Sequence, residues 1–208
     1  MQLDFFLVEG FMKERFEWIH SWCDYSEKND LPRVLLVGDS ITNAYQEIVR
    51  ELLRGVCYVD YLATSYSVDN IMFSQLCLAF FDNSRYDIIH FNHGLHGYDM
   101  TKETYKIGIE ELLCNRREII ILATSTVVYK NGVPEIHDGW REKLAERNGA
   151  MEELAEKYGY SIDDLFAVSK TIDYTQRSQD GYHYAKEGSA VLAASVVESI
   201  KNVLNSIK

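Results

Sequence analysis

Proline and cysteine are scarce in this sequence of 208 residues, which contains two prolines and four cysteines. It also lacks internal repeats and low-complexity stretches, which excludes a repeat architecture and a proline-rich linker. The cysteines, Cys23, Cys57, Cys77 and Cys114, are widely spaced and form no C-x-x-C pair. This spacing disfavours a disulfide scaffold or a zinc site and favours free thiols in a reducing compartment.

Long apolar runs and an excess of basic residues are also missing. Charged residues interrupt the N-terminal apolar stretch before a signal-peptide core could form, and no run reaches membrane-spanning length. We therefore expect a cytoplasmic protein that does not associate with membranes. The 21 Lys and Arg face 32 Asp and Glu, a net charge of −11, which disfavours nucleic acid as a partner.

Short apolar runs alternate with longer amphipathic segments along the chain. The runs cover residues 34–37, 56–62, 88–91 and 119–123, with a short further candidate at 160–162. Continuous runs of this length are typical of strands covered on both faces, and the alternation predicts a parallel sheet with helical crossovers. Helices are expected over 42–54, 69–81 and 101–114, around 140–155, and over 192–207. The predicted fold is α/β, a three-layer α/β/α sandwich with a mostly parallel, flavodoxin-like sheet.

The first 31 residues stand apart from this pattern. They are predicted to form an N-terminal helical extension, with residues 32–208 as a single α/β domain. The extension carries an aromatic and apolar set: Phe11, Phe16, Trp18, Ile19 and Trp22. Such a helix would pack on the core. An aromatic flap over the functional site, or a contact in a homo-oligomer, is the alternative.

Two short motifs carry the chemistry. The run Gly38-Asp39-Ser40 follows the first apolar strand and places a serine at the turn into a helix, beside backbone N–H groups that are not yet paired. The run Asp180-Gly181-Tyr182-His183 precedes the last helix and adds a carboxylate and an imidazole. Nucleophile, base and orienting acid are the three groups that a serine hydrolase needs. Taken singly, each residue could instead be a helix cap or a turn residue.

Together the two motifs resemble the first and last sequence blocks of the GDSL, or SGNH, hydrolase family, over about residues 33–206. The resemblance implies a serine esterase without metal or organic cofactor. Ser40 would be the nucleophile, His183 the general base, and Asp180 the group that orients His183.

The two middle blocks of the family differ in this chain. Family members use a glycine N–H and an asparagine side chain as oxyanion donors. The second-block segment, residues 63–70, contains no glycine, so the main-chain N–H of Ser65 or Ser67 would have to serve. In the third block, residues 91–96, Asn92 and His96 are both expected to line the site, and either could supply the side-chain donor.

Several other polar residues are ambiguous. His90, His93 and His96 invite a metal site, but a strand followed by a turn need not bring three rings together, so no metal is expected. Asp39 could simply accept hydrogen bonds from neighbouring loop N–H groups. Asn148, on the apolar face of its helix, is expected to pin the 124–139 loop.

The expected function is hydrolysis of a small ester through an acyl-enzyme on Ser40. Within the resembling family the substrate could carry O-acetyl or short acyl groups on a carbohydrate, on whose rings Tyr129 and Trp140 could stack. Two alternatives remain open: an acyltransferase that uses the same serine, and an inactive binding module that retains the three residues.

Overall fold

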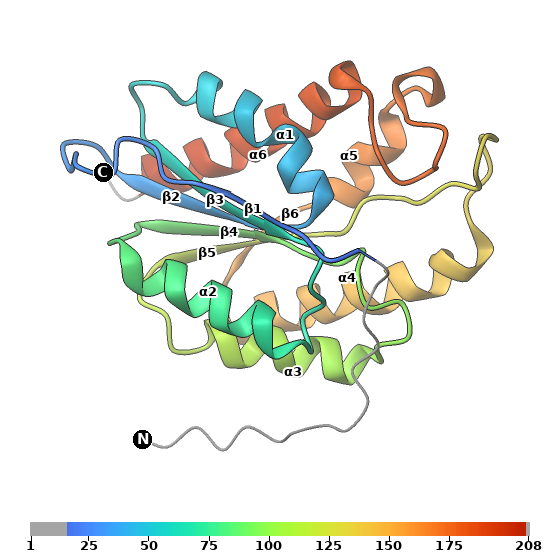
Figure 1. The fold of residues 1–208 in the computed structure, drawn as a ribbon, viewed down its shortest axis with the longest axis horizontal. Helices are drawn as coiled ribbons and strands as arrows, with labels where there is room; N and C mark the ends of the chain where they lie inside the picture. Colours follow the sequence, from blue (N-terminus) through green and yellow to red (C-terminus); the bar gives the residue numbers. More distant parts are fainter. Residues whose placement is uncertain (1–15, 207–208) are drawn as a thin grey trace.

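A mostly parallel sheet forms the middle layer of the structure, a computed structural model that describes residues 16–206 (Figure 1). In the described residues the strand order is β1-β3-β2-β4-β5-β6. All neighbouring strands pair in parallel except β1, which pairs antiparallel with β3 at one edge. The strands are β1 Ile19–Trp22, β2 Arg33–Gly38, β3 Tyr58–Thr64, β4 Ile88–Asn92, β5 Ile119–Ala123 and β6 Ser161–Asp163.

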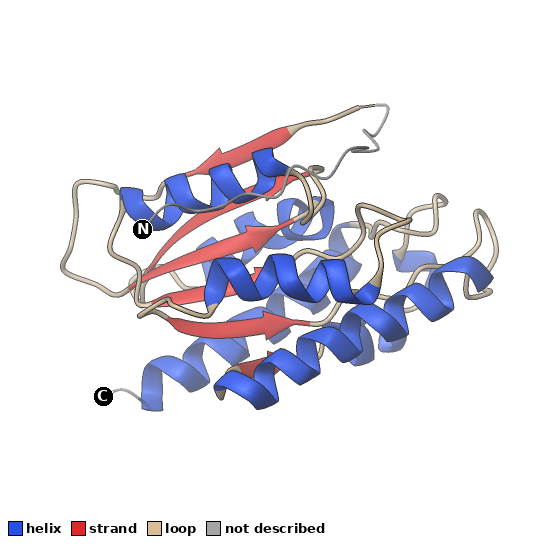
Figure 2. Ribbon diagram, turned by 90° about the horizontal axis from the view of Figure 1, so that it is seen from below, coloured by secondary structure: helices blue, strands red, loops and turns tan. Residues whose placement is uncertain are grey.

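Helices cover both faces of the sheet, as Figures 1 and 2 show. One face carries α1 (Ser40–Leu52), α5 (Leu165–Thr171) and α6 (Lys186–Ser206), and the other carries α2 (Ile71–Asn83), α3 (Lys102–Leu113) and α4 (Asp138–Tyr158). A short 3₁₀ helix, Tyr174–Gln176, lies between α5 and α6 in the sequence. No helix of residues 16–206 combines the length and apolarity needed to cross a membrane.

The alternation of side chains along the central strands produces two apolar cores. In β2, Val34 and Leu36 belong to the core under α1 and α6, whereas Leu35 and Val37 belong to the core over α2, α3 and α4. All four side chains are fully buried. The predicted three-layer α/β/α sandwich is therefore confirmed, and each predicted strand, including the short one near 161, is present. Among the α-helices of residues 16–206, α5 alone was not predicted, because its seven residues are too few to show a helical period.

The expected N-terminal helix is wrong for the described part of that segment. Ile19–Trp22 is a strand, β1, whose residues are all exposed, and it pairs with β3 in the register Ile19 to Thr64. Phe11 lies outside the described residues. Residues 19–22 form a strand because β3 would otherwise present a row of unpaired N–H and C=O groups at the edge of the sheet. Pairing with β1 satisfies these groups.

A buried arginine connects β1 to the sheet. Arg33 Nη1 lies 2.8 Å from the Asp60 carboxylate, and both side chains are almost fully buried. The same guanidinium donates to the carbonyls of Asp24, Tyr25 and Lys28, at 2.8, 2.9 and 3.0 Å. These bonds fix the segment between β1 and β2, and with it the position of β1.

Loss of this buried cation should be costly. Burial raises the pKa of Asp60, even though hydrogen bonds from Asp24, Arg33 and Tyr86 oppose the rise. In Arg33→Met the carboxylate would remain buried and unpaired, so we expect the free energy of unfolding at pH 7 to fall by about 3–5 kcal/mol. Urea unfolding measures this change.

The pH dependence and a matched control sharpen the test. Without Arg33 the pKa of Asp60 rises further, so the folded state binds more protons than the unfolded state. The loss of unfolding free energy in Arg33→Met should therefore become smaller as the pH falls from 7 to 5. Arg54 forms an exposed pair with Glu51, so Arg54→Met should cost about 1 kcal/mol or less. Equal losses in the two variants, or a deficit independent of pH, would contradict this account.

Candidate active site

The candidate nucleophile lies at the carboxyl end of the central strand β2. Ser40 is the first residue of α1, and Asp39 is its N-cap, whose side chain accepts from the Ile41 N–H at 3.0 Å. Since β2 has β3 on one side and β4 on the other, this end is the switch point of the sheet, where ligands of such folds bind. The turn is tight: a Cβ on Gly38 would lie 2.3 Å from the carbonyl oxygen of Asn92.

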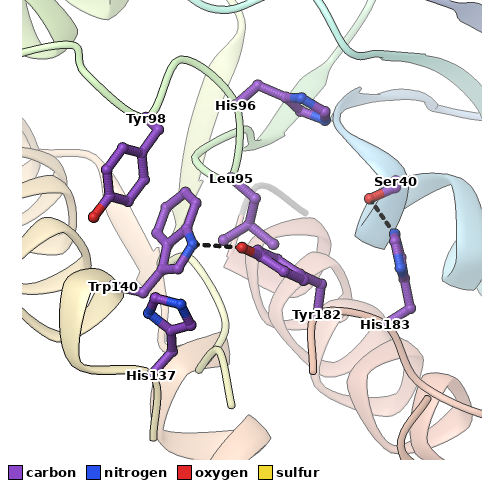
Figure 3. Close-up of a pocket in the computed structure, with 8 residues that line it drawn as sticks. All are labelled: Ser40, Leu95, His96, Tyr98, His137, Trp140, Tyr182 and His183. Carbon is purple, nitrogen blue, oxygen red and sulfur yellow. Dashed lines mark hydrogen bonds between the residues drawn. The ribbon is translucent and has the colours of Figure 1, made fainter. Parts of the chain in front are cut away.

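The three residues of the two motifs meet at this edge. His183 Nε2 lies 2.8 Å from Ser40 Oγ, and a dashed line joins the two side chains in Figure 3. His183 Nδ1 lies 2.6 Å from Asp180 Oδ2. With Nδ1–H donating to the carboxylate, Nε2 is left to accept the proton of the serine hydroxyl. A serine, a histidine and a carboxylate in this arrangement form a hydrogen-bonded relay that can support covalent acyl transfer.

The carboxylate of this relay is held by backbone as well as by the ring. Asp180 Oδ1 accepts from the N–H groups of Tyr182 and His183, at 2.8 and 3.0 Å. Partial burial would raise the pKa of Asp180, but these bonds and the bond to the His183 ring outweigh it and lower the pKa. Both side chains remain accessible, 45% for Asp180 and 43% for His183, so water reaches the base.

The turn at 180–183 is fixed by the loop that follows β5. Tyr129 N–H donates to the carbonyl of Gly181, and Gly132 N–H donates to that of Gln179, both at 2.9 Å. Gly181 has φ +80°, and a Cβ there would lie 2.1 Å from the Tyr129 carbonyl oxygen. The motif therefore requires glycine at this position for both its conformation and its contact.

Aromatic side chains form the wall of a pocket opposite the relay. The Trp140 ring N–H donates to the Tyr182 hydroxyl at 2.7 Å, and Tyr98 packs edge-on against Trp140 with ring centroids 5.2 Å apart. The pocket has a volume of about 460 Å³. It is lined by the residues drawn in Figure 3: Ser40, Leu95, His96, Tyr98, His137, Trp140, Tyr182 and His183.

Two buried ionic side chains hold the third-block loop beside Ser40. Asp39 Oδ2 accepts from the N–H groups of Gly94 and Leu95, each at 3.2 Å, in line with its expected loop-binding role. From the other side, Arg147 of α4 donates to the carbonyls of Gly94 and Gly97. Burial lowers the pKa of Arg147. This role of Arg147 was not predicted, although a charged residue on the apolar face of α4 is a sequence signal for a buried ionic contact.

Asn148 has the structural role that its position predicts. Its side-chain oxygen accepts from the Ser125 N–H at 2.8 Å, and its amide donates to the Ser125 carbonyl at 3.2 Å. The amide thus pins the start of the 124–139 loop, which in turn carries Tyr129 and His137.

The structure separates the two candidate main-chain donors of the second block. The N–H of Ser65 donates to the Trp18 carbonyl at 3.2 Å, and its hydroxyl accepts from the Trp18 N–H at 2.9 Å. Ser65 therefore belongs to the pairing with the N-terminal strand and does not serve as an oxyanion donor, contrary to the expectation that either serine could. Ser67 lies beyond β3, where its hydroxyl bonds to Asp69 and its Cβ lies close to Gly97.

The two candidate side-chain donors also lie in different places. His96 lines the pocket together with Ser40. Asn92 is at the end of β4, only 2% exposed, and is not among the pocket-lining residues. The expectation that both residues line the site is therefore wrong for Asn92 and confirmed for His96.

His90, His93 and His96, whose spacing invited a metal site, are not grouped as metal ligands in the described residues. His90 is fully buried, and its Nε2 lies 3.0 Å from Asp163, beside β6. His93 packs instead against Phe73, with ring centroids 4.5 Å apart. Within residues 16–206, no three His, Cys, Asp or Glu side chains are placed to hold a metal ion.

Comparison with known proteins identifies the fold. No protein-family model matches the sequence, and no curated protein matches it significantly. Among solved structures, an acetylxylan esterase from Geobacillus stearothermophilus is 18% identical, with a TM-score of 0.64 over 81% of this chain and 94% of the esterase. The chain has the SGNH-hydrolase fold. The predicted family resemblance is therefore confirmed at the level of the fold.

Two further structures share this SGNH-type fold. A lipase/acylhydrolase from Enterococcus faecalis is 16% identical, with a TM-score of 0.63 over 83% of this chain and 96% of the other. A protein from Slackia heliotrinireducens assigned to the SGNH hydrolases is 20% identical, with a TM-score of 0.63 over 82% of this chain and all of the other. Catalytic mutants of the Geobacillus esterase replace a histidine or a serine with alanine.

A glycine pair tests the geometry of the 180–183 turn. Gly181→Ala would push the turn away from Tyr129, so we expect labelling of Ser40 by a fluorophosphonate probe to slow by at least about tenfold. Gly132 also has positive φ, +74°, but a Cβ there meets nothing within 4 Å. Gly132→Ala should therefore retain most of the labelling rate, measured by intact mass over time. Equal rates in the two variants would show that the turn tolerates displacement.

Proposed function

We propose that this protein is a serine hydrolase that cleaves a small ester through an acyl-enzyme on Ser40. The observation that carries the proposal is the continuous relay from Ser40 through His183 to Asp180, with atom separations of 2.8 and 2.6 Å. Its location at the switch point of the sheet, next to an open pocket, supports the same conclusion.

The reaction follows from the proton positions. His183 Nε2 takes the hydroxyl proton as Ser40 Oγ attacks the ester carbonyl, and Asp180 stabilises the imidazolium that forms. The imidazolium then gives its proton to the alcohol oxygen as the carbon–oxygen bond breaks. Water, activated by His183 in the same way, attacks the acyl-enzyme and releases the acid, which restores Ser40.

The negative oxygen of the intermediate needs preorganised donors. We assign this role to the backbone N–H groups of Ser40 and Ser67 and to the ring N–H of His96. Ser40 N–H is at the first position of α1, where no earlier turn can pair it. His96 lines the pocket beside Ser40, which favours it over Asn92 as the side-chain donor.

We further propose that the alcohol part of the ester is an uncharged, hydroxyl-rich molecule such as a carbohydrate, carrying an O-acetyl or short acyl group. The aromatic wall offers ring faces for a sugar to stack on. A second pocket of about 420 Å³ shares His137 and Tyr182 with the first and is lined by Tyr129, Lys130, Asn131, His137, Asp138, Asp180 and Tyr182.

The charges of this second pocket favour a neutral alcohol. Lys130 is paired with Glu135 at 3.2 Å and with Asp138 at 3.0 Å, so its charge is neutralised within the protein. Asp180 adds a further negative charge. A phosphorylated alcohol would therefore meet repulsion, whereas a neutral sugar would not. The acetylxylan esterase among the structural neighbours is consistent with such a substrate.

The same geometry bears on the two alternatives. An acyltransferase must keep water from the acyl-enzyme, whereas here His183 and Asp180 are nearly half exposed, which favours hydrolysis. An inactive binding module would have no reason to keep Ser40 within hydrogen-bond reach of His183, yet the two atoms lie 2.8 Å apart.

Substitution of the relay tests the proposed chemistry. Ser40→Ala and His183→Ala should each lower kcat for acetyl ester hydrolysis by about 10⁵-fold or more, and Asp180→Ala by less, about 10³–10⁴-fold. Intact mass after exposure to an organophosphonate should show one adduct on the unmodified protein and none on Ser40→Ala. Retained turnover in a folded Ser40→Ala protein would rule out the covalent mechanism.

Substrate charge tests the proposed alcohol. We expect kcat/KM for an acetylated neutral methyl glycoside to exceed that for its 6-phosphate analogue by about tenfold or more, because the pocket carries excess negative charge. Asp138→Asn should reduce this difference in kcat/KM between the two esters, since it removes one of the charges that repel the phosphate. A preference for the phosphorylated ester would contradict the assignment.

A further inference from the structure

The N-terminal strand brings a tryptophan to the edge of the candidate active site. Trp18 immediately precedes β1, and both its backbone N–H and its carbonyl form hydrogen bonds at the carboxyl end of β3. Its N–H donates to Ser65 Oγ at 2.9 Å, and its carbonyl accepts from Ser65 N–H at 3.2 Å and from Thr64 Oγ1 at 2.8 Å. Since β1 is antiparallel to β3, its beginning lies at the same sheet edge as Ser40.

The indole of Trp18 contacts the imidazole of His96. The two rings meet edge-on, with centroids 6.2 Å apart and planes at 76°. The His96 ring also stacks on His93, with centroids 5.8 Å apart and planes at 21°. His96 therefore has one aromatic neighbour from the α/β domain and one from the N-terminal extension.

The inner neighbour is rigid and uncharged. His93 is only 1% exposed and stacks on Phe73 of α2 at a centroid distance of 4.5 Å. Burial lowers the pKa of His93 to about 4, so the ring is neutral at physiological pH. The outer neighbour, Trp18, is held by its backbone hydrogen bonds to Ser65 and Thr64, and its ring also packs against His20 at a centroid distance of 5.2 Å. A change of the Trp18 side chain leaves the backbone bonds intact.

We propose that Trp18 is a positioning residue, which holds the His96 ring in the orientation needed to donate to the oxyanion beside Ser40. This rests on the proposed function. An oxyanion donor is effective when its direction is set before the charge develops, and the Trp18 ring, edge-on to His96, limits the rotamers open to that side chain. Trp18 thereby becomes part of the catalytic apparatus, although it contributes no reacting group.

Substitutions at Trp18 test this role. Trp18→Leu should lower kcat for ester hydrolysis by about tenfold with KM changed less than about twofold, because the lost orientation matters in the transition state. Trp18→Phe, which keeps an aromatic edge, should recover most of kcat. The matched control is Trp22→Leu, at the other end of the same strand, where the side chain is 55% exposed and contacts Arg50; it should leave kcat unchanged.

A double-mutant comparison separates positioning from general support of the fold. His96→Ala should itself lower kcat, and Trp18→Leu should cause no additional loss in that background. An equal loss with and without the His96 ring, or an unchanged kcat in Trp18→Leu, would overturn the proposal. If Trp18→Leu lowers Tm by more than about 5 °C, Trp18→Met replaces it as the test variant.

The failure of this proposal is distinguishable from failure of the proposed function. If the unmodified protein neither hydrolyses esters nor reacts with the organophosphonate at Ser40, the proposed function fails. If it does both and kcat is indifferent to Trp18, only the positioning role fails.

Discussion

The buried carboxylate of Asp39 connects Ser40 to the rest of the candidate site. It caps the helix that begins at Ser40 and also accepts from two N–H groups of the loop that carries His96. A buried carboxylate without such partners would be very costly, so the two segments are held in one relative position. Arg147 binds the same loop from the opposite side through two carbonyls, and the loop is thereby held between two buried charges.

The two halves of the candidate site are stabilised in different ways. The half around Ser40 is built from buried strands and ionic hydrogen bonds, whereas the turn that carries Asp180 and His183 is exposed and depends on backbone bonds to the loop after β5. That loop is pinned in turn by Asn148. The α4 helix therefore supports both halves of the site: Arg147 binds the loop beside Ser40, and Asn148 binds the loop after β5.

Much of the fold could be predicted from the sequence because its signals are local. Continuous apolar runs marked the parallel strands, and Ser40 and His183 were recognisable from short motifs at strand and helix ends. The strand β1 was not predictable in this way. Its four exposed residues carry no period, and they are extended only because the edge of β3 is available for pairing.

The sequence by itself determined the three-layer architecture and the three residues of the relay, since periodicity and motif chemistry act over a few neighbouring residues. Only the tertiary structure decided which donors face the pocket. Ser65 is excluded as a candidate oxyanion donor because its N–H pairs with Trp18. His96, and not Asn92, lines the pocket. These outcomes depend on contacts between segments far apart in the chain, and such contacts are set by packing and by the need to pair every buried polar group.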